Sequence, residues 1–139
     1  YKNVDLLKEI KKACPDGVDV YFDNVGGQIL EIVLFRMNMK GRIVCCGAVS
    51  QYDGTTPIGP RNLPGLLIVK RLKMEGFIVM DYAKEHGNAI KHLSEMNAAG
   101  DIKVTEDITE GLENAPDALI GLLNGDNFGK RMVRVTADP

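Results

Sequence analysis

The sequence predicts an α/β fold built around a parallel sheet, and three observations support this prediction. Apolar residues recur at helical spacing in several segments, and short runs rich in β-branched and aromatic residues lie between these segments. The two kinds of segment alternate along most of the chain, with glycine or proline at many of the changes. Such alternation is typical of parallel strands joined by helices that cover both faces of the sheet.

The first third of the chain predicts two helices and two strands. In chain order these are a helix over residues 6–13, a strand over 18–22, a helix over 28–39 and a strand over 42–46. Pro15-Asp16-Gly17 ends the first helix, and Asp23-Asn24-Val25-Gly26-Gly27 turns the chain into the second. Lys40-Gly41 ends that second helix as a cation followed by a glycine.

The remainder of the chain begins with a loop rich in proline and glycine over residues 50–63, at the carboxyl end of a predicted strand, where functional loops are common. The expected elements that follow are a helix over 66–72, a strand over 77–80, a helix over 89–96, a strand over 104–109, a helix over 116–123 and a strand over 131–135. The pattern changes after Gly100, so we expect a domain boundary near residue 100.

The composition excludes several classes of function. The chain has 139 residues, 17 Lys and Arg against 19 Asp and Glu, and a formal net charge of -2, so charge alone attracts neither nucleic acid nor a membrane surface. We expect no membrane span and no secretory signal. The 3 cysteines form no C-x-x-C pair, and His86 and His92 are six residues apart, which argues against disulfides and a metal site. A reducing cytoplasm is the expected location.

Four short segments carry a family resemblance. They are Phe22-Asp23-Asn24-Val25-Gly26-Gly27, Cys46-Gly47-Ala48-Val49-Ser50-Gln51-Tyr52, Met74-Glu75-Gly76-Phe77-Ile78-Val79 and Gly125-Asp126-Asn127-Phe128-Gly129-Lys130. In this order and spacing they resemble the zinc-independent reductases of the medium-chain dehydrogenase/reductase family. The chain is most similar to the branch of prostaglandin reductases and leukotriene B4 12-hydroxydehydrogenases, and the resemblance covers essentially all of it.

The resemblance implies a Rossmann-like doubly wound parallel sheet and an enzyme that uses NADPH. Residues 1–100 would form part of the NADP-binding domain without its first βαβ unit, and residues 101–139 would return to the catalytic domain. The implied reaction reduces the carbon-carbon double bond of α,β-unsaturated ketones or aldehydes, as a 15-oxoprostaglandin 13-reductase does. The glycine turn G-x-G-x-x-G that holds a pyrophosphate is absent. We therefore expect a fragment that is inactive and binds the cofactor poorly by itself.

The resemblance also assigns residues to the site. Asn24 would contact the cofactor, and a loop of seven residues would run along its nicotinamide half: Cys46, Gly47, Ala48, Val49, Ser50, Gln51 and Tyr52. Tyr52 is the catalytic candidate, because a phenol can donate a hydrogen bond to an oxygen that gains negative charge. The backbone of Phe77, Ile78 and Val79 would bind the carboxamide. Asn127 would lie near the cofactor, and Tyr1 near its 2'-phosphate.

Each assignment has a structural alternative. Asn24 could cap a glycine turn, Tyr52 could be an exposed loop residue, and Asn127 could be a polar turn residue. Phe77 to Val79 could also form a plain core strand. For the whole protein, the alternatives are an NADPH quinone reductase of the same superfamily and a non-catalytic nucleotide-binding module. We further expect a homodimer through an outer strand near Phe77 to Met80.

Overall fold

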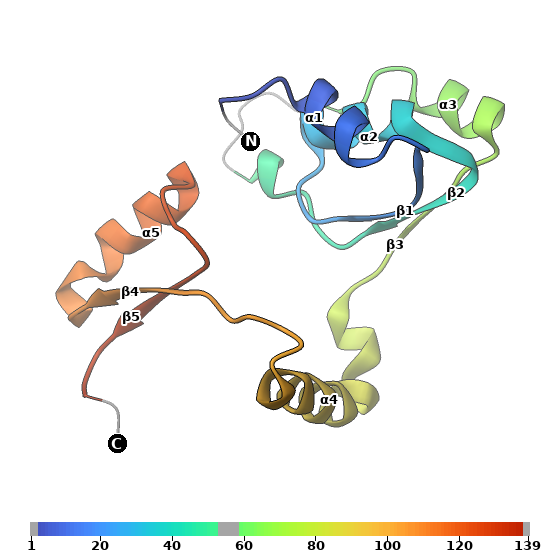
Figure 1. The fold of residues 1–139 in the computed structure, drawn as a ribbon. Helices are drawn as coiled ribbons and strands as arrows, with labels where there is room; N and C mark the ends of the chain where they lie inside the picture. The colour runs from blue at the N-terminus through green and yellow to red at the C-terminus, as the bar shows by residue number, and fades with distance from the viewer. Residues whose placement is uncertain (1–2, 53–58, 138–139) are drawn as a thin grey trace. The chain divides into compact units, whose positions relative to one another are not determined.

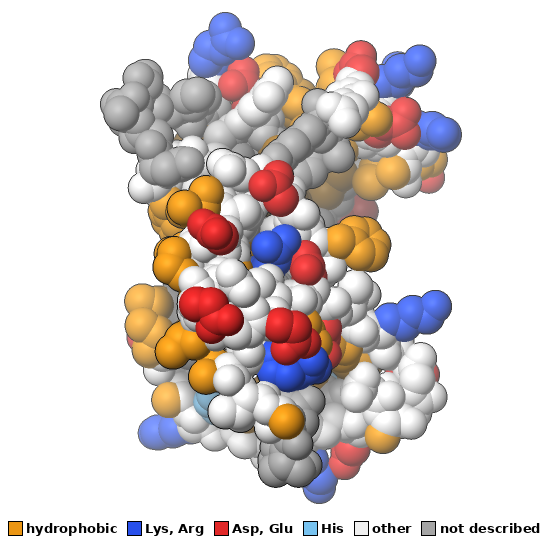
Figure 2. Space-filling model, turned by 90° about the vertical axis from the view of Figure 1, so that its left-hand side faces the viewer, with side chains coloured by type: hydrophobic (Ala, Val, Ile, Leu, Met, Phe, Trp, Pro, Cys, Tyr) orange, Lys and Arg blue, Asp and Glu red, His pale blue; other side chains and the backbone are white. Residues whose placement is uncertain are grey.

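The computed structural model describes residues 3–52 and 59–137. The chain divides into two compact units, Tyr1–Ala83 and Lys84–Pro139, each of which is described by itself (Figure 1). In the described residues, no helix combines the length and the apolar character that crossing a bilayer requires. Acidic and basic side chains both occur across the face in Figure 2, in keeping with the balanced charge.

The first helix, α1 (Leu6–Ala13), lies where the sequence predicts it. The carboxylate of Asp5 caps it by accepting a hydrogen bond of 3.1 Å from the backbone nitrogen of Lys8. Lys11 and Lys12 occupy the last turn, where cations interact favourably with the helix dipole. The local signals at both ends of the helix agree with its apolar spacing, which explains why the bounds could be predicted.

A three-stranded parallel sheet forms the centre of the first unit. Its strands are β1 (Val18–Asp23), β2 (Met37–Cys45) and β3 (Lys73–Gly76), in the order β1-β2-β3. Together with α1, the helices α2 (Gly27–Arg36) and α3 (Leu63–Lys70) lie on one side of this sheet (Figure 1). The core between them consists of Leu30, Val33, Leu34, Met37, Ile43 and Leu66.

Three predictions in this unit were wrong. The helix expected over residues 66–72 begins at Leu63 and ends at Lys70. The second helix ends at Arg36 rather than Met39, because Met37 adopts an extended conformation, is buried and begins β2 beside Val18. The extra residues before Arg42 form an irregularity in the strand, with Lys40 at a φ of 65°. The last strand is Lys73–Gly76 rather than residues 77–80, which follow it and lead into the 3-10 segment η2 (Val79–Glu85).

The second unit contains the helix α4 (His86–Ala99) and a two-stranded parallel sheet. The chain runs from β4 (Glu106–Glu110) through η3 (Leu112–Asn114) and α5 (Ala115–Asn124) to β5 (Lys130–Arg134). Asp107 on β4 pairs with Arg131 on β5 at 2.9 Å, and both side chains are partly buried. The two strands and the helix between them lie close to the predicted positions, and the strands pair in parallel. The assignment of residues 1–100 and 101–139 to two domains of a longer enzyme stays a prediction.

Candidate functional site

The carboxyl ends of the three strands of the first unit meet at one edge of the sheet. The last residues of the strands are in register, with Asp23 beside Cys45 and Cys45 beside Gly76. The backbone nitrogen of Cys46 donates to the oxygen of Asp23 at 2.8 Å, and that of Phe77 donates to the oxygen of Cys45 at 3.2 Å. This edge is where open parallel sheets bind their ligands, so the segments after the strands form the candidate site.

The turn after β1 depends on two glycines. Gly26 has φ 70° and ψ -149°, a combination that residues with a side chain rarely adopt. Gly27 has φ 56°, and a β-carbon there would lie 2.7 Å from the Ser50 hydroxyl oxygen. The turn therefore needs glycine at both positions, once for its conformation and once for the close approach of the next loop.

The loop after β2 is attached to this turn residue by residue. The nitrogen of Val49 donates to the oxygen of Asn24 at 3.1 Å, and both the nitrogen and the hydroxyl of Ser50 donate to the oxygen of Val25, at 3.1 and 2.6 Å. The short 3-10 helix η1 (Val49–Gln51) carries these donors. The turn at Asn24 and the loop from Cys46 to Tyr52, both predicted as site residues, are thus neighbours joined by hydrogen bonds.

Tyr52 lies at the end of this loop, and its side chain is 71% exposed. Its hydroxyl oxygen would be 3.6 Å from a β-carbon at Gly47, and the same β-carbon would be 3.1 Å from the oxygen of Asn24. The phenol therefore folds back over Gly47 toward the end of β1. This position suits a hydrogen-bond donor at the strand edge, and the high exposure also fits a plain loop tyrosine.

Asp23 was not among the predicted site residues, yet it is central to the turn. It is 1% exposed, and its Oδ1 accepts hydrogen bonds from the nitrogens of Val25 and Gly26 and from the Tyr21 hydroxyl, at 3.0, 2.9 and 3.0 Å. Burial, followed by the hydrogen bond to Asp23, raises the pKa of Tyr21, so this phenol remains a donor at neutral pH. The signal that could reveal Asp23 is an acidic residue three positions before the first turn glycine.

The cysteines at the end of β2 differ in their surroundings. Cys45 is partly buried, and burial, followed by the charge of Asp23, raises the pKa of its thiol. Cys46 is exposed at the strand edge. The raised pKa disfavours a reactive thiolate at Cys45, which packs against the core as a small apolar residue does.

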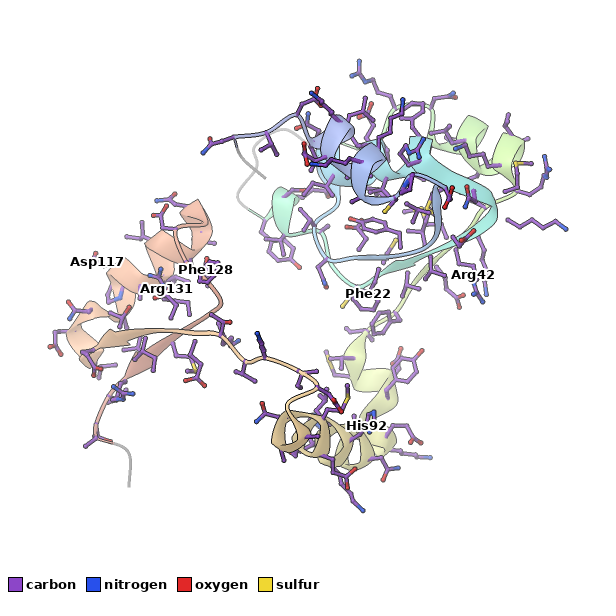
Figure 3. All side chains as sticks on the ribbon, in the orientation of Figure 1. Phe22, Arg42, His92, Asp117, Phe128 and Arg131 are labelled. Carbon is purple, nitrogen blue, oxygen red and sulfur yellow. The ribbon has the colours of Figure 1, made fainter. Side chains whose placement is uncertain are left out.

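Phe77, Ile78 and Val79 lie immediately after β3 rather than within a strand. The Phe77 ring packs edge-on between Phe22 and Tyr82, with centroid distances of 5.9 and 5.7 Å. Phe22 extends from the sheet on the side opposite the helices (Figure 3). Ile78 and Val79 have exposed side chains. The segment therefore stays at the same strand edge as the turn and the loop, and its backbone leaves the sheet there.

Asn127 belongs to the second unit, and Tyr1 lies outside the described residues. The Asn127 amide nitrogen donates to the oxygen of Gly129 at 2.8 Å, within its own turn. The Asp107 carboxylate holds the same turn by accepting from the nitrogen of Phe128 at 3.0 Å. These contacts are those of a polar turn residue, and a role for Asn127 near a cofactor stays a prediction.

The strand edge of the first unit presents backbone groups and hydroxyls. Among residues 3–52 and 59–137, no group of three or more His, Cys, Asp or Glu side chains could hold a metal. The strand edge instead offers glycine backbone that a ligand can approach closely and one exposed phenol. Backbone groups at such an edge can bind the amide and ribose groups of a nucleotide.

Comparisons with known proteins agree with this geometry. The 2-alkenal reductase (NADP(+)-dependent) of Nicotiana tabacum is 43% identical over 134 residues, which are 96% of this chain and 39% of the relative. Prostaglandin reductase 1 of Bos taurus is 43% identical over 136 residues, 96% of this chain and 41% of the relative. The crystal structure of CurA from Vibrio vulnificus in complex with NADPH is 40% identical, with a TM-score of 0.87, over 99% of this chain and 42% of that one.

The chain therefore spans less than half the length of these relatives. Their names agree with the branch that the four motifs indicate, and the structural match confirms the predicted Rossmann-like fold. The family model described as "Zinc-binding dehydrogenase" matches residues 1–95. This match covers more than half of the chain, so the chain belongs to the zinc-binding dehydrogenase family.

Proposed function

We propose that this chain is part of an NADPH-dependent reductase that acts on the carbon-carbon double bond of α,β-unsaturated ketones or aldehydes. The observation that supports the proposal most directly is the attachment of the Cys46–Tyr52 loop to the turn at Asn24, beside the end of β3. Relatives whose names include 2-alkenal reductase and prostaglandin reductase 1 support the same substrate class. Because the chain spans less than half of their length, the activity is proposed for the longer protein.

NADPH, when bound, supplies the hydride. In the proposed site, Asn24 would contact the cofactor and the Cys46–Tyr52 loop would run along its nicotinamide half. The backbone of Phe77 to Val79 would bind the carboxamide and so fix which face of the ring is presented to the substrate. Hydride addition at the β-carbon of an enone moves an electron pair onto the carbonyl oxygen. Tyr52 would donate a hydrogen bond to that oxygen, and a proton from solvent would complete the α-carbon.

Several finer assignments belong to the same proposal. We propose that the enzyme needs no zinc, that Tyr1 and Asn127 lie near the cofactor, and that the protein is cytoplasmic. A homodimer would pair the edge strand β3, since the predicted strand at residues 77–80 is replaced by Lys73–Gly76. We also propose that the 139 residues by themselves bind NADPH weakly and do not turn it over, which calorimetric titration with NADPH would test.

The decisive experiment follows NADPH oxidation by the full-length protein with an enone, in wild type and in Tyr52→Phe. Loss of a preorganised donor to a developing oxyanion lowers kcat by roughly 100- to 1,000-fold, and the KM for NADPH should change little. Tyr82→Phe is the matched control, because it removes the hydroxyl of a similarly exposed tyrosine that packs on Phe77. Unchanged turnover in Tyr52→Phe would exclude Tyr52 from the chemistry.

The two alternatives give different results in the same assay. A quinone reductase would oxidise NADPH with a quinone and leave the enone unreduced. A non-catalytic nucleotide-binding module would bind NADPH and turn over neither acceptor.

A further inference from the structure

Asp23 is the one charged side chain with less than 9% exposure among the described residues, with 1% of its surface accessible. A buried carboxylate is costly unless hydrogen bonds or an opposite charge compensate it. None of the ion pairs within residues 3–52 and 59–137 includes Asp23. Its compensation comes instead from three donors that converge on Oδ1: the Tyr21 hydroxyl and the nitrogens of Val25 and Gly26.

Two of these donors belong to the turn that carries Asn24. The carboxylate therefore binds the backbone immediately after Asn24, including Gly26, whose φ of 70° and ψ of -149° are accessible to glycine. Hydrogen bonds to a buried carboxylate are stronger than those between neutral groups, so they restrict the conformations open to this glycine-containing backbone. The backbone nitrogens of the Asn24 turn thus share one side-chain acceptor, the Asp23 carboxylate.

The backbone oxygens of the same residues hold the neighbouring loop. The oxygen of Asp23 accepts from the nitrogens of Cys46 and Gly47, at 2.8 and 3.2 Å, and the oxygens of Asn24 and Val25 accept from the loop beyond. A rotation of the Asn24 turn would move these acceptors as well. The position of the Tyr52 loop is therefore coupled to the Asp23 carboxylate through the turn.

We propose that Asp23 is a positioning residue, whose carboxylate fixes the Asn24 turn and, through it, the Cys46–Tyr52 loop for the cofactor. The inference rests on the proposed function, since it takes this strand edge as the NADPH site. Asp23 itself need not touch the ligand, because its Oδ1 already accepts three hydrogen bonds. Tyr21 has a supporting role as the third donor, and its raised pKa keeps the hydroxyl proton in place.

The test measures kcat and the KM values for NADPH and for the enone in the full-length protein, for wild type and Asp23→Ala. We expect the KM for NADPH to rise by about tenfold or more, because the turn loses the acceptor of two backbone donors. The KM for the enone should stay within about twofold. Asp19→Ala is the matched control, because Asp19 is an exposed residue of the same strand with one side-chain hydrogen bond, to Asn38.

Two further variants keep the proposal testable if Asp23→Ala does not fold. Asp23→Asn retains an oxygen acceptor at Oδ1, so it should recover part of the NADPH affinity, and Tyr21→Phe removes only one donor and should raise the KM by about threefold or less. Amide hydrogen exchange at Val25 and Gly26 should speed up in the same order as the KM rises.

The two possible failures are distinguishable. If wild-type protein oxidises no NADPH with any enone, the proposed function fails. If wild type is active and Asp23→Ala, or Asp23→Asn where the alanine variant is unfolded, keeps the wild-type KM for NADPH, then the positioning role is wrong. If kcat falls and the KM values for NADPH and for the enone rise by the same factor, Asp23 has a general structural role, and the proposal is overturned.

Discussion

The contact between Gly27 and Ser50 gives a prediction with a magnitude. Gly27→Ala places a β-carbon 2.7 Å from the Ser50 hydroxyl oxygen and forces alanine into a φ of 56°. The left-handed conformation costs about 1–2 kcal/mol for a residue with a side chain. Displacement of Ser50 breaks its 2.6 Å hydrogen bond to the oxygen of Val25, which is worth about 0.5–1.5 kcal/mol. The expected destabilisation of the first unit is therefore about 1.5–3.5 kcal/mol.

A double-mutant cycle separates the steric contact from the backbone strain. Ser50→Ala alone loses the hydrogen bond and should cost about 1 kcal/mol. In the double variant, the hydroxyl oxygen that clashes with the new β-carbon is absent. Each single variant loses the hydrogen bond from Ser50 to Val25, but the double variant loses it only once. The double variant should therefore be about 1 kcal/mol more stable than the sum of the two single effects, well above the roughly 0.3–0.5 kcal/mol seen for independent sites.

Amide hydrogen exchange of the α2 and β2 amides is the suitable assay, because it reports the opening of the first unit separately from the second. Gly87→Ala, read from the amides of α4 in the second unit, is the control for a generic glycine effect. A β-carbon at Gly87 would meet no atom within 4 Å, and the residue lies in α4, so alanine should be neutral or stabilising by up to about 1 kcal/mol. Additive effects in the cycle, or a cost below about 1 kcal/mol for Gly27→Ala, would refute the argument.

Two further predictions concern the core and the second unit. Leu34 is fully buried, so Leu34→Ala should lower the free energy of unfolding by about 2–5 kcal/mol in the same exchange experiment, and a loss below about 1 kcal/mol would contradict its place in the core. The hydrogen bond from the Phe128 nitrogen, followed by Arg131, lowers the pKa of Asp107, so its stabilisation is present above about pH 4 and is lost as pH falls through the lowered value. Acid unfolding, monitored by circular dichroism, should therefore show a shallower loss of stability below about pH 4 in Asp107→Asn than in wild type. Identical unfolding curves for the two proteins would rule this contribution out.

Local signals explain which elements could be predicted from the sequence. Helix α1 has a cap, an apolar stripe and basic residues in its last turn, and all of these lie within the element itself. The end of α2 also has a basic residue, Arg36, but apolar residues continue on both sides of it into β2, so this signal does not mark the boundary. An apolar run does not distinguish a buried helix from a buried strand. The pairing of Met37 with Val18 places Met37 in a strand, and these two residues are far apart in the sequence.

The strand β3 shows the opposite error. Phe77 to Met80 have the stronger β-forming side chains, yet the strand is Lys73–Gly76, of which Met74 alone packs against the core. The apolar character of residues 77–80 relates to other contacts, such as the packing of Phe77 between Phe22 and Tyr82. Strand propensity reflects packing against neighbours more than a preference of the backbone, so it located the apolar segment and misplaced the strand by four residues.

One feature of the candidate site could be predicted from the sequence and another could not. The proximity of Asn24 to the Cys46–Tyr52 loop could be predicted, because the carboxyl ends of parallel strands meet at one edge whatever their side chains are. The role of Asp23 could not, because it depends on which face of β1 the helices cover. Strand alternation places Asp23 on the same face as Tyr21, and the helices turn that face into the core. The sequence predicts Asp23 only as a turn residue, whereas in the fold its carboxylate is the buried acceptor for the turn. A substitution at Asp23 should therefore affect cofactor binding without any contact to the cofactor.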